Sequence, residues 1–301
     1  MSEGNVVSRY GSLGDYGEWR AVIQEYYWDR LEPAYAMAIR LGVGATGAYE
    51  GWYRLIEAET VTRRQSEEIA VNDWLTLESS AHSHELAHLT VEACENVARR
   101  FGFANRPKTM VTLLAEETDA PWAVGRFGYM MDKYPYDKIC IPAGAAASFH
   151  GFQEVVSHEY AHVGVLDVTQ GRAPHWLNEA VAMLAEQSSD LRMRRAFASG
   201  EARWLSPRGL ELVHTARRQG EPHPAKTWRA YQQSAWIGRY LVSLKGEEGI
   251  GELLRAFSDN SIWTEIKMRV TNQPPADEAL RQVYGMSEQA VFDQALAWIQ
   301  G

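Results

Sequence analysis

The sequence has few cysteines, no long apolar run and no excess of basic charge, and each shortage argues against a class of protein or site. Its two cysteines, Cys94 and Cys140, lie far apart and form no CxxC pair, so we expect buried thiols rather than metal ligands. No apolar stretch is long enough to span a bilayer. The net charge of −9 at pH 7 argues against a general nucleic-acid binder, which needs a basic surface. We therefore expect neither a nucleic-acid partner nor a membrane partner.

The first residues also lack a basic segment followed by an apolar one, which is the pattern of a secretory signal. We therefore expect a cytoplasmic protein. The 301 residues are enough for one large domain or two modest ones, and the composition is that of an ordinary globular protein. Nothing in the sequence indicates the oligomeric state.

The first third of the chain is predicted to be mainly helical. Residues 15–70 favour helix, with a glycine-rich break at 42–47. A short extended segment is expected at 74–78. Apolar side chains then recur at helical spacing over 83–101, and Gly102 is a typical stop. Most strands of the sheet are therefore expected in the middle of the chain.

Three β-rich segments follow, and the rest of the chain returns to helix. The segments 108–114, 125–131 and 138–141 are predicted strands, while the pattern from 149 to the end is helical. Ser287 is the expected N-cap of the last helix. This order predicts an α+β fold with a small mixed sheet and a helical C-terminal half.

The predicted helix that begins near residue 149 contains an HExxH pattern formed by His158, Glu159 and His162. Positions four apart on a helix differ by about 40° around the axis and about 6 Å along it, so both imidazoles can hold one metal ion. Glu159 would then lie beside a metal-activated water and could serve as general base. Two histidines do not complete a catalytic zinc site, which usually takes three protein ligands.

A third ligand is expected downstream, on a second helix. Seventeen residues after His162, Glu179 follows Pro174 in an apolar, alanine-rich segment that reads as the start of a helix. A carboxylate from the first turn of that helix would complete a His₂Glu site of the kind that zinc accepts.

The sequence also contains a second HExxH, at His84–His88, so the pattern alone is weak evidence for a metal site. The next carboxylates, Glu92 and Glu95, lie on the same predicted helix and cannot close around an ion held by His84 and His88. The following elements are strands, so no second helix offers a glutamate. We interpret this copy as a chance match on a solvated helix face.

The segments HEYAH and PHWLNEAVA together resemble the gluzincin zinc metallopeptidases, in particular the peptidase MA-like family. The second segment is also similar to the third-ligand helix of aminopeptidase-N-like enzymes. The resemblance covers residues 75–301 and is specific at the zinc motif. It implies a thermolysin-like architecture in which a small mixed sheet and the active-site helix pack against a helical subdomain.

Carried over residue by residue, the resemblance makes His158, His162 and Glu179 the ligands of one zinc ion and Glu159 the catalytic base. Glu186 matches a family glutamate that could orient a ligand histidine, although a solvated helix glutamate fits its spacing equally well. Two departures stand out. Ala180 replaces the usual glycine, and the strand at 125–131, where the family pairs with extended substrate, lacks the exopeptidase signature.

The residue that stabilises the oxyanion is less defined. Tyr231, in the matched helical segment, is the candidate, with His214 and His223 as alternatives and ordinary packing as the competing interpretation for each. His175 could touch substrate or cap its helix, and His150 is best interpreted as a helix-face neighbour of His158.

The resemblance predicts a zinc-dependent metallopeptidase acting on a peptide or protein substrate. Residues 1–72 would form an N-terminal helical extension and 73–301 the catalytic domain, divided into an α/β part (73–170) and a helical part (171–301). The alternatives are a gluzincin-like protein that binds zinc without turnover and serves partner binding, and a helical scaffold with two coincidental motifs.

Overall fold

The computed structural model describes residues 17–42, 49–80, 84–115, 129–132, 136–187, 190–218, 224–258 and 276–301. The chain divides into two compact units. The first consists of Met1–Glu95 and Arg106–Val163, and the second of Asn96–Asn105 and Gly164–Gly301. The division at residues 72 and 170, made from the sequence, stays a prediction.

The first unit begins with three helices, α1 (Trp19–Tyr27), α2 (Leu31–Leu41) and α3 (Glu50–Gln65). Helix α2 ends at Gly42, whose φ of 70° favours glycine. Most of the predicted break at 42–47 lies outside the described residues. The helical prediction for 15–70 is confirmed for these three helices and is wrong for Glu67–Ala70, which forms strand β1. Pairing with β2 decides the conformation of this polar segment, because local propensity is weaker than a ladder of hydrogen bonds.

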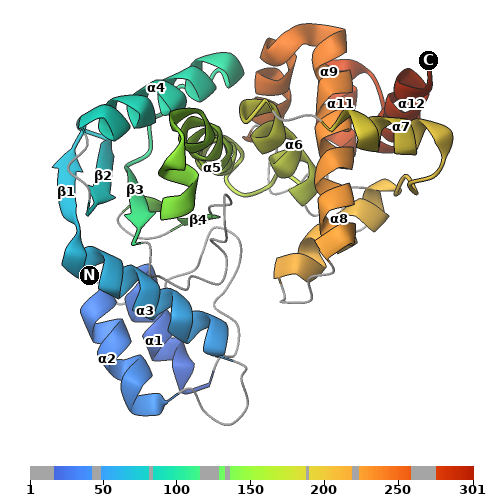
Figure 1. The fold of residues 1–301 in the computed structure, drawn as a ribbon. Coiled ribbons are helices and arrows are strands. Elements are labelled where there is room, and N and C mark those ends of the chain that lie inside the picture. Colours follow the sequence, from blue (N-terminus) through green and yellow to red (C-terminus); the bar gives the residue numbers. More distant parts are fainter. Residues whose placement is uncertain are drawn as a thin grey trace. The chain divides into compact units, whose positions relative to one another are not determined.

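The sheet is small and mixed, as the fold class predicts, and its strands lie in the order β1-β2-β3-β5-β4. Figure 1 shows β1, β2 and β3 in succession. Strands β2 (Leu75–Ser79), β3 (Thr109–Leu114) and β5 (Asp137–Pro142) run parallel and are almost entirely buried. Strand β4 (Tyr129–Asp132) pairs antiparallel with β5 and forms an edge of the described sheet. The predicted strand at 125–131 is therefore seen from Tyr129 onward, and its earlier residues lie outside the described part.

The N-terminal helices pack against this sheet through one apolar core. Leu114 of β3 and Cys140 of β5 join buried side chains from α1, α2 and α3, among them Tyr26 and Ile56. Trp19 stacks on Tyr49, with ring centroids 5.2 Å apart. This core makes the three helices part of the unit that holds the sheet.

A group of charged side chains is buried beside that core. Lys138 of β5 forms ion pairs with Glu59 of α3 and Glu78 of β2, and all three are inaccessible to solvent. Arg63 of α3 binds the other oxygen of Glu78 at 3.0 Å, and Thr112 of β3 donates to this carboxylate at 2.7 Å. These partners hold the pKa of Glu78 below its usual range despite its burial. Ionic contacts therefore join α3 to the centre of the sheet.

Helix α4 (His84–Phe101) and helix α5 (Phe149–Thr169) each begin in the first unit and end in the second. Helix α4 confirms the prediction for 83–101, and Gly102 follows it with a φ of 66°. A one-turn 3₁₀ helix, η1 (Ala143–Ala147), precedes α5. Both cysteines, Cys94 in α4 and Cys140 in β5, are buried thiols, as expected.

The second unit is helical, as predicted from residue 149 onward. Its elements are α6 (His175–Ala185), α7 (Leu191–Ser199), α8 (Pro207–Arg218), α9 (Pro224–Ser258), α11 (Asp277–Tyr284) and α12 (Glu288–Gln300). Helix α9 is kinked at Gly246, which has a non-helical φ of 70°. The predicted N-cap of α12 is confirmed, since the Ser287 side chain accepts from the main-chain N–H of Ala290. None of the described helices is long and apolar enough to cross a membrane.

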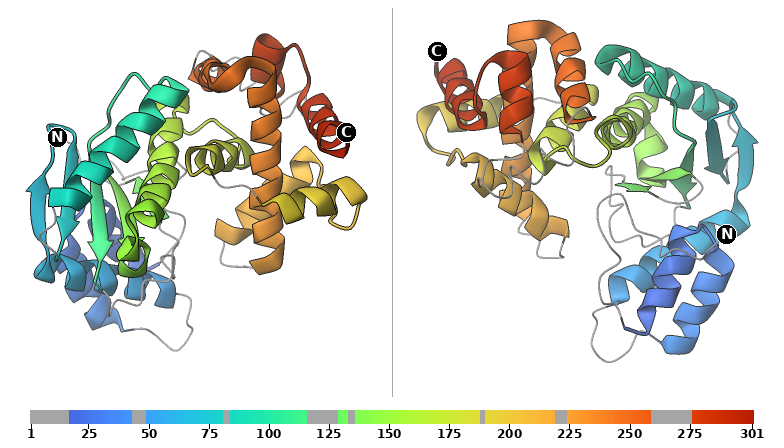
Figure 2. Two further views of the ribbon diagram at one scale, coloured as in Figure 1. Left: turned by 45° about the horizontal axis from the view of Figure 1, so that its top comes forward. Right: turned by 180° about the vertical axis from the view of Figure 1, so that it is seen from behind.

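Helices α6 and α9 pack side by side (Figure 2). They approach closely at Gly238. A Cβ atom added at Gly238 would lie 3.2 Å from Cβ of Ala180 and 3.1 Å from Cδ1 of Leu184. Ala180 is thus accommodated by a glycine on the facing helix. This contact fixes how deeply α6 lies against α9.

Candidate metal centre

Helix α5 carries the HExxH residues in a well-defined helical setting. The Ser148 hydroxyl accepts from the main-chain N–H of Gly151 and so caps the first turn. Phe152, Val156 and Tyr160 are buried and anchor the helix. At Gly164 the Phe103 ring lies where a Cβ would be, at 2.0 Å, so only glycine fits there.

The two histidines lie on one face of α5, as the four-residue spacing requires. Their ring centroids are 5.0 Å apart and the ring planes are inclined by 82°. Both residues are partly exposed, whereas Glu159 between them is 6% exposed. The helix thus offers two imidazoles with access to solvent and a largely buried carboxylate next to them in the sequence.

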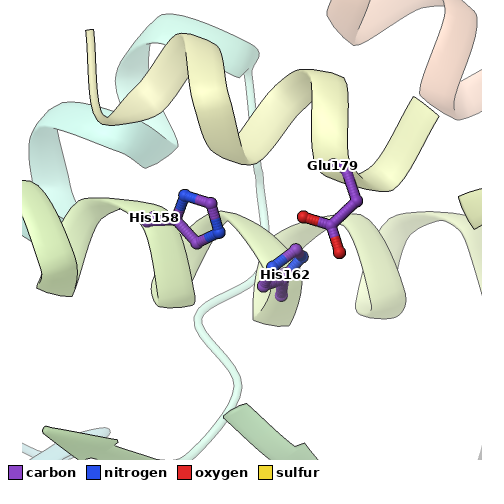
Figure 3. A group of neighbouring side chains, drawn as sticks. All are labelled: His158, His162 and Glu179. Atoms are coloured by element: carbon purple, nitrogen blue, oxygen red, sulfur yellow. The ribbon is translucent and has the colours of Figure 1, made fainter. Parts of the chain in front are cut away.

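Glu179 of α6 joins these histidines. One ligand atom from each of His158, His162 and Glu179 lies within 4.8 Å of the others, and the three side chains point toward one another (Figure 3). This is the one such group of three or more potential ligands among the residues that the structure describes. Two ring nitrogens and a carboxylate oxygen are donors that zinc accepts.

The ligand atoms of this group, within 4.8 Å of one another, are spaced more widely than a bound zinc ion requires. Ligands about 2.0–2.1 Å from a tetrahedral ion lie about 3.4 Å apart, so the ligand atoms would draw in when an ion binds. Rotation about side-chain bonds of the glutamate and the imidazoles can supply a change of this size. The three residues therefore fit a zinc ion in donor type and are close to it in spacing.

The other HExxH copy has no such surroundings. His84, Glu85 and His88 are all exposed on α4. They belong to no group of potential metal ligands in the described part of the chain. The interpretation of this copy as a solvated helix face is confirmed.

The first turn of α6 is held by a carboxylate that the sequence analysis did not find. The N-cap of α6, Pro174, has no side chain that can accept a hydrogen bond. Glu211 of α8 replaces it: Oε1 accepts from the main-chain N–H of His175 at 3.2 Å, and Oε2 from that of Trp176 at 3.4 Å. The same Oε1 lies 2.5 Å from Nδ1 of His175. The sequence shows that α6 starts without a capping side chain of its own, but it does not indicate which distant carboxylate accepts from the free N–H groups.

A second carboxylate holds the next residue of α6. The indole Nε1 of Trp176 donates to Oε1 of Glu288 at 2.6 Å, and Trp176 packs edge-on against Phe292 of α12. The main-chain N–H of Glu288 in turn donates to Asp277 at 2.9 Å. Helices α8, α11 and α12 thus all contribute to fixing the start of the helix that carries Glu179.

The remaining candidates lie in different settings. Tyr231 of α9 packs edge-on against His214, whose Nε2 lies 3.2 Å from the Ser234 hydroxyl in the buried α8–α9 contact. Glu186 is the C-cap residue of α6 and is partly exposed. His223 lies outside the described residues. The roles suggested for Tyr231 and Glu186 stay predictions.

His150 behaves as an ordinary neighbour on the surface of α5. Its Nε2 lies 3.2 Å from Glu154, one turn further along, and its side chain is 85% exposed. This agrees with its interpretation as a helix-face residue.

No protein-family model matches this sequence, and no curated protein is significantly similar to it. The functional argument therefore rests on the residues of the centre and on their arrangement.

Proposed function

We propose that this protein is a zinc-dependent metallopeptidase of gluzincin architecture. The observation that carries the proposal is the convergence of His158, His162 and Glu179, drawn from two helices, into one group with the donor set of a catalytic zinc site. An HExxH pattern alone would not suffice, because His84–His88 has the same pattern and no third ligand among the residues that the structure describes.

When bound, zinc would supply Lewis acidity, polarising a peptide carbonyl and lowering the pKa of water toward neutrality. The three protein ligands would hold the ion and leave it accessible to water and substrate, as in other catalytic zinc sites. Glu159, directly after His158 on α5, would take a proton from the attacking water and pass it to the leaving amine.

We expect an extended substrate to bind along strand β4. It is an edge of the described sheet, and an edge strand offers main-chain N–H and C=O groups for pairing with a further strand. A peptide bound in this way would be held by its backbone, so recognition would depend little on its side chains at the paired positions.

Metal analysis is the first test, because metal binding and turnover are separate claims. Wild-type protein purified from metal-poor medium and then given one equivalent of zinc should retain about one ion per chain. Glu179→Gln should weaken retention at least tenfold, because it removes the anionic ligand. His84→Ala is the matched control in the other HExxH and should retain zinc like the wild type.

Turnover is the second test. A broad peptide library should show cleavage that a chelator abolishes and zinc restores, and Glu159→Gln should lose it while keeping the metal. Undiminished zinc in Glu179→Gln, or loss of zinc in His84→Ala, would contradict the assignment of the centre. Zinc binding without any cleavage would instead favour a gluzincin-like protein that serves partner binding.

A further inference from the structure

In the second unit, His175 and Glu211 form a pair that has no role in the zinc chemistry proposed above. Both residues are partly exposed, with 29% and 33% of their side chains accessible, so the pair reaches solvent. Glu211 contacts the imidazole and the main chain of the same residue, which fixes the ring as well as the backbone.

The position of His175 along α6 brings it close to a proposed metal ligand. His175 and Glu179 are four residues apart in one continuous helix. Such residues share a helix face, with their Cβ atoms about 6 Å apart. The His175 ring therefore lies on the side of α6 that also presents Glu179.

Glu211 determines which ring nitrogen of His175 is available. The carboxylate contacts Nδ1, at 2.5 Å. Burial raises the pKa of Glu211, but its contacts with His175 and Trp176 lower the pKa by more, so the net shift is downward. Glu211 is thus an anion, so Nδ1 carries a proton and Nε2 is the atom left for another group. Among the described residues the ring has no side-chain partner besides Glu211.

Two other described histidines have different settings. His150 pairs with Glu154 on its own helix, with its side chain 85% exposed. His214 is buried, and its Nε2 faces Ser234. His175 is contacted by a carboxylate from another helix and lies one turn from a proposed ligand.

We propose that His175 is a substrate-binding residue of the metal centre, whose Nε2 accepts a hydrogen bond from a main-chain N–H of a bound peptide, and that Glu211 is its positioning residue. By accepting from Nδ1–H, the carboxylate of Glu211 leaves the lone pair of Nε2 as the acceptor. This inference rests on the peptidase function proposed above.

The test measures binding rather than turnover. Zinc-loaded protein is titrated calorimetrically with a phosphinic pseudotripeptide, whose phosphinate oxygens bind zinc and imitate a tetrahedral carbonyl centre. His175→Ala should weaken the Kd at least tenfold while zinc stoichiometry and far-UV circular dichroism stay those of the wild type. His150→Ala, which removes an exposed His–Glu pair, should change nothing. His175→Gln gives a second variant if the alanine variant folds poorly, and it should lose affinity in the same way.

A double-mutant cycle separates positioning from helix capping. Glu211→Gln keeps one oxygen for a main-chain N–H of α6 but loses the anion that orients the ring. It should weaken inhibitor binding several-fold in the wild type and not at all in the His175→Ala background. A purely structural role for Glu211 would give the same loss in both backgrounds.

The outcomes distinguish this inference from the proposed function. Equal inhibitor affinity in wild type and His175→Ala would overturn the role of His175 and leave the zinc centre intact. Failure of the zinc-loaded wild type to bind the inhibitor at all would overturn both.

Discussion

Nζ of Lys138 lies 3.1 Å from Oε2 of Glu59, and neither side chain is accessible to solvent. The two residues come from β5 and α3, so a charge pair connects the N-terminal helices to the middle of the sheet. Tyr26 of α1 also donates to Glu59, and Lys138 has a second carboxylate partner in Glu78. Burying these charges is tolerated because each has an opposite charge beside it.

Removing the cation from this group should therefore be costly. Lys138→Met leaves two buried carboxylates without their shared partner, and we expect a loss of about 3–5 kcal/mol in the free energy of unfolding. Urea denaturation followed by circular dichroism measures it. Lys245→Met is the control, because the Lys245–Glu252 pair is 3.5 Å long and exposed, and it should cost less than about 1 kcal/mol. Adding Glu59→Gln to Lys138→Met should recover part of the loss, and a further loss would contradict the pairing.

Glu288 should make stability depend on pH in the neutral range. Burial, with smaller contributions from Glu211 and Asp277, raises the pKa of this carboxyl to about 7. A pKa raised by folding contributes stability that is complete below the unfolded pKa, about 4.3, and is lost as the pH rises through 7. Glu288→Gln keeps an oxygen for the Trp176 indole and removes the charge. We expect it to stabilise the protein by on the order of 2 kcal/mol at pH 8 and by much less at pH 5.

Denaturation midpoints at the two pH values provide the comparison for Glu288. Glu248→Gln, at an exposed position of α9, should leave stability nearly unchanged at both. An equal effect of Glu288→Gln at pH 5 and pH 8 would show that burial of this carboxyl does not set the pH dependence.

The close crossing of α6 and α9 predicts a reciprocal pair of substitutions. Gly238→Ala places a Cβ 3.2 Å from that of Ala180, and we expect it to cost about 1–3 kcal/mol as the helices separate. Adding Ala180→Gly makes room again and should restore much of the loss in melting temperature. Gly51→Ala is the control, because Gly51 lies in open space within α3. Gly200→Ala is unsuitable, because the positive φ of Gly200 strains any side chain.

Zinc should stabilise the fold if it binds the folded centre. A free zinc concentration about a hundred times the Kd would add about 2.7 kcal/mol to the free energy of unfolding. The melting temperature should rise accordingly for the wild type and for His84→Ala. Glu179→Gln should show a markedly smaller rise at the same zinc concentration, because its affinity is lower. An identical rise in Glu179→Gln would argue that zinc acts elsewhere on the chain.

Much of the fold class followed from local pattern. Apolar periodicity and a stop residue located α4, and the pattern indicated helix from residue 149 onward. Short extended or β-rich segments located β2, β3 and β5. Helix and strand repeats are properties of a few neighbouring residues. Glu67–Ala70 was the exception. Its sequence has no marked strand pattern, and pairing with β2 decides its conformation.

The sequence by itself determined the local half of the centre. Four-residue spacing on a helix places His158 and His162 on one face whatever the surroundings, and the same spacing in His84–His88 gave an exposed pair. What distinguishes the two copies is the approach of Glu179. The helix start after Pro174 pointed to this residue, and the resemblance of the WLNEA segment supported it. The tertiary structure decided the carboxylates that hold α6: Glu211 and Glu288 lie 36 and 112 residues from their partners His175 and Trp176. Such contacts depend on how helices pack, and no periodicity within one helix encodes which distant acidic residue will reach it.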